Sequence, residues 1–247
     1  MKIIALAVLL CAAPARAELR EITTMADIVP AIDTATVLVF DIDNTLVEPV
    51  GQLGSDQWYY YLLKAYARDG MTEAAAETKA GETWSKTLPT VKVKPVETIT
   101  PGIIRDAQKR GIKVMALTAR GPEDANATFA QLKAIGVDLT VTPPSKKDLA
   151  TEQKGLFTRG VFFQGEGPSK GATLVAFFKK IGLKPKRVVF ADDKPKHAIS
   201  VEAALRESGI PVISFRYGAA DAKVKFFNSM MEEAATPQAA DLLFRGK

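Results

Sequence analysis

The sequence has almost none of the residues on which thiol and imidazole chemistry depends. Of its 247 residues, only Cys11 is a cysteine and only His197 is a histidine. Because Cys11 lies in a segment that we expect to be removed, the mature chain has no disulfide, thiol nucleophile or thiolate metal site. His197 lies outside the motifs described below, so we expect it to be structural or solvent-facing. Stability must then come from an ordinary hydrophobic core, for which the chain is long enough.

The sequence also has no apolar run of membrane-spanning length. Ile3–Ala13 is apolar but far shorter than the about 20 residues that a transmembrane helix needs. Lys2 precedes this run, and the cleavage pattern Ala15-Arg16-Ala17 follows it, as in a secretory signal peptide. We therefore predict export to the bacterial periplasm or beyond the cell, with no stable membrane anchor after cleavage. A lipoprotein anchor on Cys11 is the weaker alternative, because a leucine precedes it where a small residue is expected.

Charge of one sign is only mildly in excess. The net charge is +5, and removal of Lys2 and Arg16 with the signal peptide leaves +3. This excess is too small and too scattered to indicate a nucleic-acid partner, but it is compatible with small anionic substrates. The densest basic run, Lys179–Arg187, is interpreted as a solvated helix end. Hydrophobic residues make up 47% of the chain and charged residues 25%, as is typical of globular proteins.

The most informative stretch is Val37–Leu46, which reads V-L-V-F-D-I-D-N-T-L. Its first four residues are typical of a strand buried on both faces of a parallel sheet. Asp41 and Asp43 follow, at the strand end where ligands of open α/β sheets bind. Two carboxylates about 4 Å apart repel by roughly 4 kcal/mol at an effective dielectric constant near 20, which implies a shared cation or proton. Alternatively, Asp41 caps a turn and Asp43 faces solvent.

The rest of the chain alternates between strand and helix patterns. This alternation predicts an α/β fold, a Rossmann-like parallel sheet flanked by helices. We expect a lead-in with a short helix near residues 25–32, a helix at 102–110 with Thr100 as N-cap and Pro101 in its first position, and peripheral helices after residue 219. The further strands are expected at residues 112–117, 137–141, 160–164, 187–191 and 210–215, and the further helices at 122–135, 172–181 and 198–208.

A helical insert is expected early in the chain. Asp43 and Thr118 stand 75 positions apart, which exceeds what the loop, helix and strand of a core require. Helix patterns at residues 56–69 and 71–86 fill the excess, and this region holds both tryptophans and four of the five tyrosines. The predicted organisation is a signal peptide (1–17), a catalytic core (18–50 and 98–247) and a small helical cap (51–97).

Four groups of polar residues stand at or just past the ends of predicted strands. They are Asp41 with Asp43, Thr118, Lys170, and Asp192 with Asp193. Each group alone is weak evidence, but together they complement one another chemically. Acids hold a hard cation, a hydroxyl and the N–H groups of a helix start bind an anion, and a lysine neutralises the remaining charge.

In these groups the chain resembles the haloacid dehalogenase-like (HAD) superfamily. The first motif of that superfamily, D-x-D-x-T, stands here as residues 41–45, and Thr118, Lys170 and Asp192-Asp193 match the other three. The resemblance covers roughly residues 34–44 and 98–215. The stretches F-D-I-D-N-T-L and L-G-S-D-Q-W also resemble those of an exported branch of this superfamily whose substrate is unknown (DUF2608-like).

The resemblance implies a covalent mechanism of phosphate-ester hydrolysis. Asp41 would be the nucleophile that forms an aspartyl-phosphate. Asp43 would protonate the leaving alkoxide and later activate water. Lys170 would offset the charge of nucleophile and phosphate. An acid at position 43 fits phosphomonoester hydrolysis, because dehalogenases lack an acid there and transport ATPases carry threonine.

The resemblance also implies a Mg²⁺ cofactor. The metal would be held by Asp41, by the backbone carbonyl of Asp43 and by one acid of the fourth motif. We favour Asp193 as the direct ligand and place Asp192 behind it. Mg²⁺ usually keeps several waters and takes one or two carboxylates, which suits this set.

Phosphoryl oxygens would be bound at the same edge of the sheet. Thr118 would contact them together with the N–H groups of Ala119 and Asn44. Arg120 either adds a phosphate contact or is a surface arginine at a helix start. Phosphoryl transfer needs little beyond such positioning and charge stabilisation.

The sequence thus predicts an exported, Mg²⁺-dependent phosphomonoester hydrolase. A small phosphorylated molecule is the expected partner, because helical caps in this position usually restrict access to small substrates; this expectation depends on fold analogy. Two alternatives stay open. One is a phosphotransferase, in which an alcohol replaces water, and the other is a binding protein that has kept the fold without activity.

Overall fold

The structure, a computed structural model, describes residues 17–152, 154–165 and 167–233. Residues 1–16 of the predicted signal peptide, Cys11 among them, lie outside the described residues. One eight-stranded sheet forms the centre, with the strand order β1-β10-β9-β2-β5-β8-β7-β6. Its strands are β1 (Ala17–Ile22), β2 (Thr36–Phe40), β5 (Lys113–Thr118), β6 (Leu149–Ala150), β7 (Leu156–Thr158), β8 (Val161–Phe163), β9 (Arg187–Asp192) and β10 (Val212–Tyr217).

The strands from β1 to β8 in this order pair in parallel, whereas β7 pairs antiparallel with both β8 and β6. The carboxyl ends of the parallel strands therefore lie along one edge of the sheet. The predicted α/β class with a Rossmann-like parallel sheet is confirmed. The β6–β7 hairpin precedes β8 in the chain and extends the sheet beyond it.

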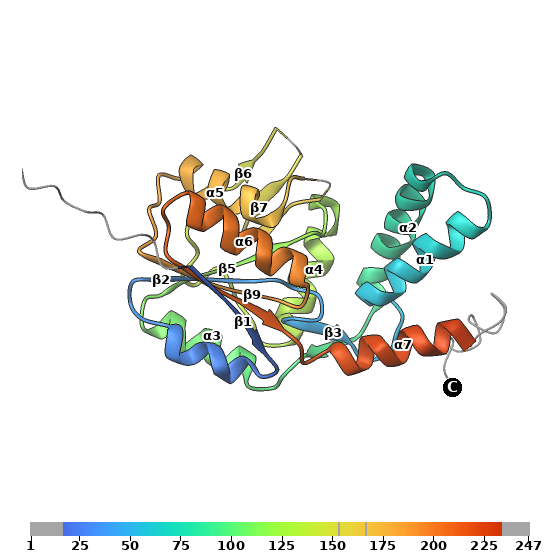
Figure 1. The fold of residues 1–247 in the computed structure, drawn as a ribbon, viewed down its shortest axis with the longest axis horizontal. Helices are drawn as coiled ribbons and strands as arrows, with labels where there is room; N and C mark the ends of the chain where they lie inside the picture. Colours follow the sequence, from blue (N-terminus) through green and yellow to red (C-terminus); the bar gives the residue numbers. More distant parts are fainter. Residues whose placement is uncertain (1–16, 153, 166, 234–247) are drawn as a thin grey trace, which may run out of the picture.

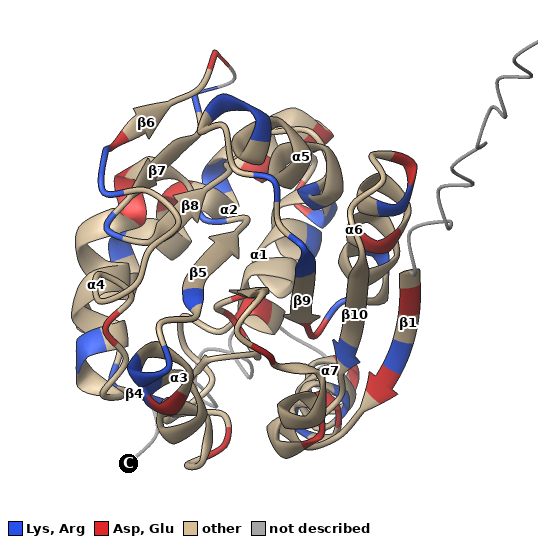
Figure 2. Cartoon of the chain, turned by 90° about the vertical axis from the view of Figure 1, so that its left-hand side faces the viewer, with Lys and Arg blue, Asp and Glu red and all other residues tan. Residues whose placement is uncertain are grey.

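Helices cover both faces of the sheet (Figures 1 and 2). In β2, Leu38 and Phe40 pack into one hydrophobic cluster, whereas Val37 and Val39 pack into a second one on the opposite face. This alternation follows from the two-residue period of a strand. The first cluster includes residues of η1 (Met25–Ala31), α3 (Thr100–Lys109) and α4 (Ala125–Ala134), and the second includes residues of α5 (Lys170–Lys180) and α6 (Pro195–Glu207).

The insert is a pair of helices beside the sheet (Figure 1). Ser55 and Thr72 cap the two helices through their side chains. The insert comprises β3 (Val47–Pro49), α1 (Asp56–Arg68), α2 (Glu73–Thr87), η2 (Leu88–Thr90) and β4 (Val93–Pro95). The strands β3 and β4 form a short antiparallel pair at its base. The helix α7 (Asp221–Glu233) contacts α1.

Three local predictions were wrong. No strand forms at residues 137–141, because the Asp138 carboxylate accepts hydrogen bonds from Thr140 N (2.8 Å) and Oγ1 (2.6 Å) and bends the chain. Thr100 is the first residue of α3 rather than its N-cap, which is Ile99. The lead-in contains the edge strand β1, whose charged residues hid its strand character.

Acidic and basic residues are interspersed over the helices of both layers (Figure 2). This distribution agrees with the small net charge of the chain. Among the described residues, no helix is both long enough and apolar enough to cross a membrane.

Candidate active site

The carboxyl edge of the sheet gathers all four groups of predicted site residues. Asp41 follows β2 and donates its N–H to the Ala191 carbonyl of β9 at 2.9 Å. Thr118 ends β5, and Lys170 begins α5. Contacts between side chains, described next, connect these elements. The sequence-predicted convergence therefore exists in the fold.

Lys170 is a buried cation between two carboxylates. Its side chain is 2% exposed, and its Nζ donates to Asp41 Oδ1 at 2.5 Å and to Asp192 Oδ2 at 2.7 Å. Burial alone would lower the pKa of Lys170, but the charges of Asp192 and Asp41 outweigh burial and raise it to about 12. Gly171 allows this placement, because a Cβ there would overlap the carbonyl oxygen of Ser200 in α6.

The two acids of the fourth motif differ in their surroundings. Asp192 is fully buried, and both of its oxygens have donors: Lys170 Nζ, the backbone N–H of Lys194 (2.8 Å) and His197 Nδ1 (3.1 Å). Burial would raise the pKa of Asp192, but Lys170 and His197 together lower it to about 2. Asp192 is thus saturated by protein donors.

Asp193 is left with one free oxygen. Its N–H donates to Thr45 Oγ1 (3.2 Å), and its Oδ2 accepts from the Asn44 side-chain amide (3.4 Å). Its Oδ1 is buried and has no hydrogen-bond partner among the described residues. Burial, and then the charges of Asp41 and Asp192, raise the pKa of Asp193 to about 8. A buried carboxylate oxygen without a donor is costly unless a cation or proton binds it.

These carboxylates fit a divalent cation. Oxygens of Asp41, Asp192 and Asp193 lie within 4.8 Å of one another. Burial, together with the charges of Asp192 and Asp43, raises the pKa of Asp41 to about 7. Three ionised carboxylates and the ammonium group of Lys170 have a net charge of −2, which one divalent cation neutralises. Ligands that are all oxygen atoms suit Mg²⁺. The free Oδ1 singles out Asp193, beside Asp41, as the better ligand of the fourth-motif pair.

Asp43 is paired with Arg120. The guanidinium donates from Nε to Asp43 Oδ2 (2.9 Å) and from Nη2 to Oδ1 (2.7 Å). Arg120 is 4% exposed, so the alternative of a surface arginine is wrong. Burial would lower the pKa of Arg120, but the Asp43 charge raises it. Its role as a phosphate contact stays a prediction.

The predicted phosphate ligands lie at the same edge. The buried Thr118 hydroxyl accepts the N–H of Arg120 at 3.2 Å, and Ala119 between them is exposed. Asn44 adopts a left-handed conformation with a φ of 57°. Its N–H, expected to face phosphate, donates to the Val47 carbonyl at 2.9 Å instead. Asn44 therefore contacts the acidic cluster through its side chain.

Sequence reasoning missed the residues that tie the insert to the site. Lys194 Nζ donates to Asp56 Oδ1 and to the Tyr60 hydroxyl of α1, both at 2.8 Å. Burial raises the pKa of Asp56 despite this pair. The Asn44 side-chain amide also donates to Gln57 Oε1 at 3.4 Å. The only hint in the sequence was the position of Lys194, directly after the acidic pair.

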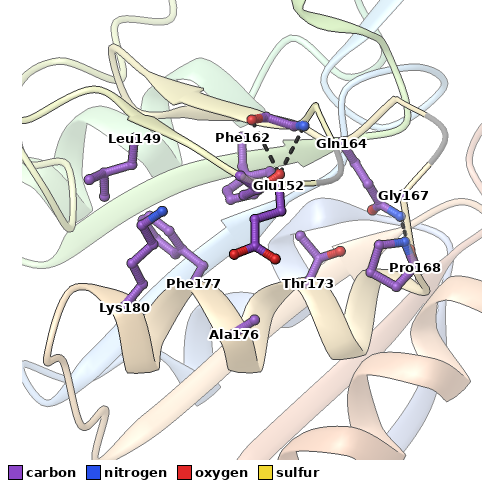
Figure 3. A pocket seen from close by; sticks show the side chains of 12 residues that line it. Leu149, Glu152, Phe162, Gln164, Gly167, Pro168, Thr173, Ala176, Phe177 and Lys180 are labelled. Carbon is purple, nitrogen blue, oxygen red and sulfur yellow. Dashed lines mark hydrogen bonds between the residues drawn. The ribbon is translucent and has the colours of Figure 1, made fainter.

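A hollow of about 230 Å³ lies elsewhere, between α5 and the strands β6–β8 (Figure 3). Phe162 and Phe177 form much of its apolar wall, and none of the acids described above lines it. Gln164 at its rim donates from Nε2 to the Pro168 carbonyl. The acidic and basic side chains of the candidate site thus lie at the carboxyl edge of the sheet and not in this hollow.

Comparison with families of known sequence finds one that spans most of the chain. The family described as "Protein of unknown function (DUF2608)" matches residues 21–242. A protein of Chlamydia pneumoniae, named "Putative outer membrane protein", is 23% identical over 203 residues, which cover 82% of this chain and 77% of that protein.

Solved structures with a similar chain course include HAD hydrolases. A haloacid dehalogenase-like hydrolase of Streptococcus pneumoniae is 14% identical, covers 78% of this chain and 92% of its own, and has a TM-score of 0.44. A HAD family enzyme of Bacteroides thetaiotaomicron, in complex with magnesium and inorganic phosphate, is 9% identical, covers 72% of this chain and 93% of its own, and has a TM-score of 0.42. The HAD-like core is evident in the parallel sheet and in the motif residues along its carboxyl edge.

Proposed function

The chain belongs to the DUF2608 family, and from its acidic site we propose that it is an exported, Mg²⁺-dependent phosphomonoester hydrolase. One observation carries the proposal: Lys170 joins Asp41 to Asp192, while the adjacent Asp193 keeps a buried oxygen without a donor. A purely structural ion pair would leave no such oxygen, because burial without a partner costs free energy. A site for a cation beside a nucleophile explains it.

Asp41 is proposed as the nucleophile. Its carboxylate is buried at the end of β2, and Lys170 holds one of its oxygens. Lys170 therefore fixes the orientation of the carboxylate and offsets the negative charge that phosphate brings. Attack on phosphorus would form an aspartyl-phosphate and release the alcohol, and water would then free the enzyme.

Asp193 and Asp41 would hold Mg²⁺, with the Asp43 backbone carbonyl as a further ligand. When bound, the ion supplies charge neutralisation for the phosphoryl oxygens. Asp192 has a different task in this proposal, because its donors already occupy both oxygens. It orients Lys170 and the start of α6.

Asp43 is proposed as the general acid and base. Its carboxylate stands two residues after Asp41 and is held by Arg120 in a bidentate pair. It would give a proton to the leaving oxygen and later take one from water. Thr118 and the Ala119 N–H would contact phosphoryl oxygens at the exposed end of β5.

The substrate is proposed to be a small phosphorylated molecule. Asp56 and Gln57 of the insert contact Lys194 and Asn44 at the edge of the acidic site. An insert in this position limits the room beside the nucleophile, which disfavours phosphate groups on folded proteins. Export is proposed from the signal-peptide pattern, and the outer-membrane name of the chlamydial relative supports it.

The direct test is hydrolysis of para-nitrophenyl phosphate by the mature protein. With Mg²⁺ we expect turnover, and with EDTA we expect a loss of at least about 100-fold that added Mg²⁺ reverses, since a metal ion contributes several kcal/mol to such transition states. Release of nitrophenolate is measured by absorbance. Adding an alcohol distinguishes transfer from hydrolysis, because a transferase would make a new phosphate ester. Absence of turnover on a panel of phosphomonoesters would contradict the proposal.

Mg²⁺ should also stabilise the fold, and more at high pH than at low pH. The pKa values of Asp41 (about 7) and Asp193 (about 8) exceed the value near 3.9 of an unfolded aspartate. Between about pH 4 and pH 8 the folded chain therefore binds more protons, so the metal-free protein loses stability as pH rises. The lowered pKa of Asp192 changes the stability of the fold only below about pH 4.

Thermal unfolding measures this effect. At pH 8 and 100 times Kd, Mg²⁺ adds about 2.7 kcal/mol, a shift in Tm of roughly 5–10 °C, whereas at pH 5 protons compete and the shift is small. Asp193→Asn should remove the shift, and Asp106→Asn, at an exposed acid of α3, should keep it. An unchanged Mg²⁺ response in Asp193→Asn would exclude Asp193 as a ligand.

A further inference from the structure

The guanidinium group of Arg120 donates hydrogen bonds from all three of its nitrogen atoms. Besides its two hydrogen bonds to Asp43, its Nη1 donates to Thr128 Oγ1 and to Gln131 Oε1, both at 2.8 Å. Thr128 and Gln131 stand three residues apart and thus share one face of α4. Both are buried polar residues, and their contacts with Arg120 account for that burial.

The insert closes the other side of Arg120. The ring of Trp84, from α2, lies 5.3 Å from Arg120 Cζ, within the range of a cation–π contact. Gln131 donates from Nε2 to the Leu88 carbonyl at 3.2 Å, so the end of α2 is bonded to the residue that holds Arg120. Trp84 itself donates from Nε1 to the Ser55 carbonyl at 3.2 Å. The position of the guanidinium therefore depends on the position of α2.

The helix α7 packs against the insert. Phe227 of α7 is fully buried and belongs to one cluster with Trp58, Trp84 and Leu88. Its ring lies 6.3 Å from that of Tyr61 in α1. The neighbouring Phe226 is 60% exposed. We call Trp58, Trp84, Leu88 and Phe227 the aromatic cluster; it contains one residue of α7 and three of the insert.

Arg120 is the group that orients the carboxylate of Asp43. Among the described residues, the side chain of Asp43 is hydrogen-bonded only to Arg120. A carboxylate on two rotatable bonds turns freely unless a partner fixes it. A buried bidentate arginine fixes both oxygens at once.

We propose that Arg120 positions Asp43 for proton transfer, and that the aromatic cluster, through Trp84, holds Arg120 in place. Phe227 of α7 thereby supports the active site from outside, because it contributes no group to the chemistry. This inference depends on the proposed function, in which Asp43 is the general acid. It goes beyond that function by connecting α7 with the proton-transfer step.

Proton donation gives the inference a specific readout. A nitrophenolate leaves without much help from an acid, whereas the alkoxide of an alkyl phosphate needs a proton as the bond breaks. A misplaced Asp43 therefore slows formation of the aspartyl-phosphate selectively for alkyl phosphates, and kcat/KM reports this step because it covers the reaction up to release of the alcohol. A loss of folded protein, by contrast, slows both substrates by the same factor.

The experiment compares Phe227→Leu with Phe226→Leu, a matched pair of buried and exposed positions in one helix. For Phe227→Leu we expect kcat/KM on propyl phosphate to fall at least 10-fold and kcat/KM on para-nitrophenyl phosphate to fall less than 3-fold. Phe226→Leu should leave kcat/KM unchanged for both substrates. Trp84→Ala should repeat the selective loss, and Trp84→Phe, which keeps a ring under the guanidinium, should restore most of it. Equal losses on both substrates, or none, would overturn the inference.

A second measurement does not require turnover. Phe227 and Asp43 share no contact, so independent effects on the urea midpoint would add. We expect Phe227→Leu to shift the midpoint less in an Asp43→Asn background than in the wild type, because the supported ion pair is already lost there. Additive shifts would overturn the inference even if the wild type hydrolyses no phosphate. Non-additive shifts with an inactive wild type would instead reject the proposed function alone.

Discussion

Asp41→Asn is expected to abolish phosphatase turnover, with a loss of roughly 10⁴-fold or more, as is usual when a covalent nucleophile is removed. The amide cannot attack phosphorus. Its oxygen can still accept the hydrogen bond of Lys170, so the surroundings of the site persist. The substitution also removes one charge from three crowded carboxylates, and it should therefore leave the folded state intact.

Steady-state hydrolysis of para-nitrophenyl phosphate with Mg²⁺ measures this loss, and thermal unfolding checks the fold. Intact mass confirms that the asparagine has not deamidated to aspartate. Asp106→Asn, at an exposed acid paired with Lys109, serves as the matched control and should keep full activity. Residual turnover above a few per cent of wild type would exclude Asp41 as a covalent nucleophile.

Asp43→Asn is expected to slow turnover by roughly 10²–10⁴-fold, the usual contribution of general acid–base catalysis. The asparagine oxygen can retain one hydrogen bond from Arg120, so the loss reflects proton transfer rather than misplacement. For alkyl phosphates the loss of turnover should lie at the upper end of this range, because their leaving alkoxides need the proton most.

The measurement is kcat on an alkyl and an aryl phosphate, with release of inorganic phosphate as the signal. In a single turnover with the aryl substrate, the variant should still accumulate an acid-stable phosphoryl adduct on Asp41, detectable by mass, if water activation has slowed. An unchanged kcat on both substrates would assign the acid–base role to another group and would also remove the premise for the role of Arg120.

Much of the site could be predicted because it depends on local sequence at strand ends. The apolar run before Asp41 predicts a buried strand, and the same pattern precedes Thr118 and Asp192. In a parallel sheet the carboxyl ends of strands meet at one edge, so residues far apart in the chain are brought together by topology. The helix start at Lys170 is placed there by the same rule.

Other features could not be predicted, because they depend on partners distant in the chain. The edge strand β1 carries charges and is recognisable only by its pairing with β10. The predicted strand at residues 137–141 was displaced by the turn at Asp138 and by β8, which takes the edge of β5. The predicted division into core and cap stays a prediction, as does the signal peptide.

The amino-acid sequence alone determined which acids, hydroxyl and lysine stand at the strand ends, because strand and helix patterns are local and a parallel sheet aligns them. Only the tertiary structure decided how these groups are paired: Lys170 between Asp41 and Asp192, Asp193 with a free oxygen, and Arg120 on Asp43. The physical reason is that the partner of a charged side chain is chosen by burial and reach in space. No spacing along the chain encodes that choice.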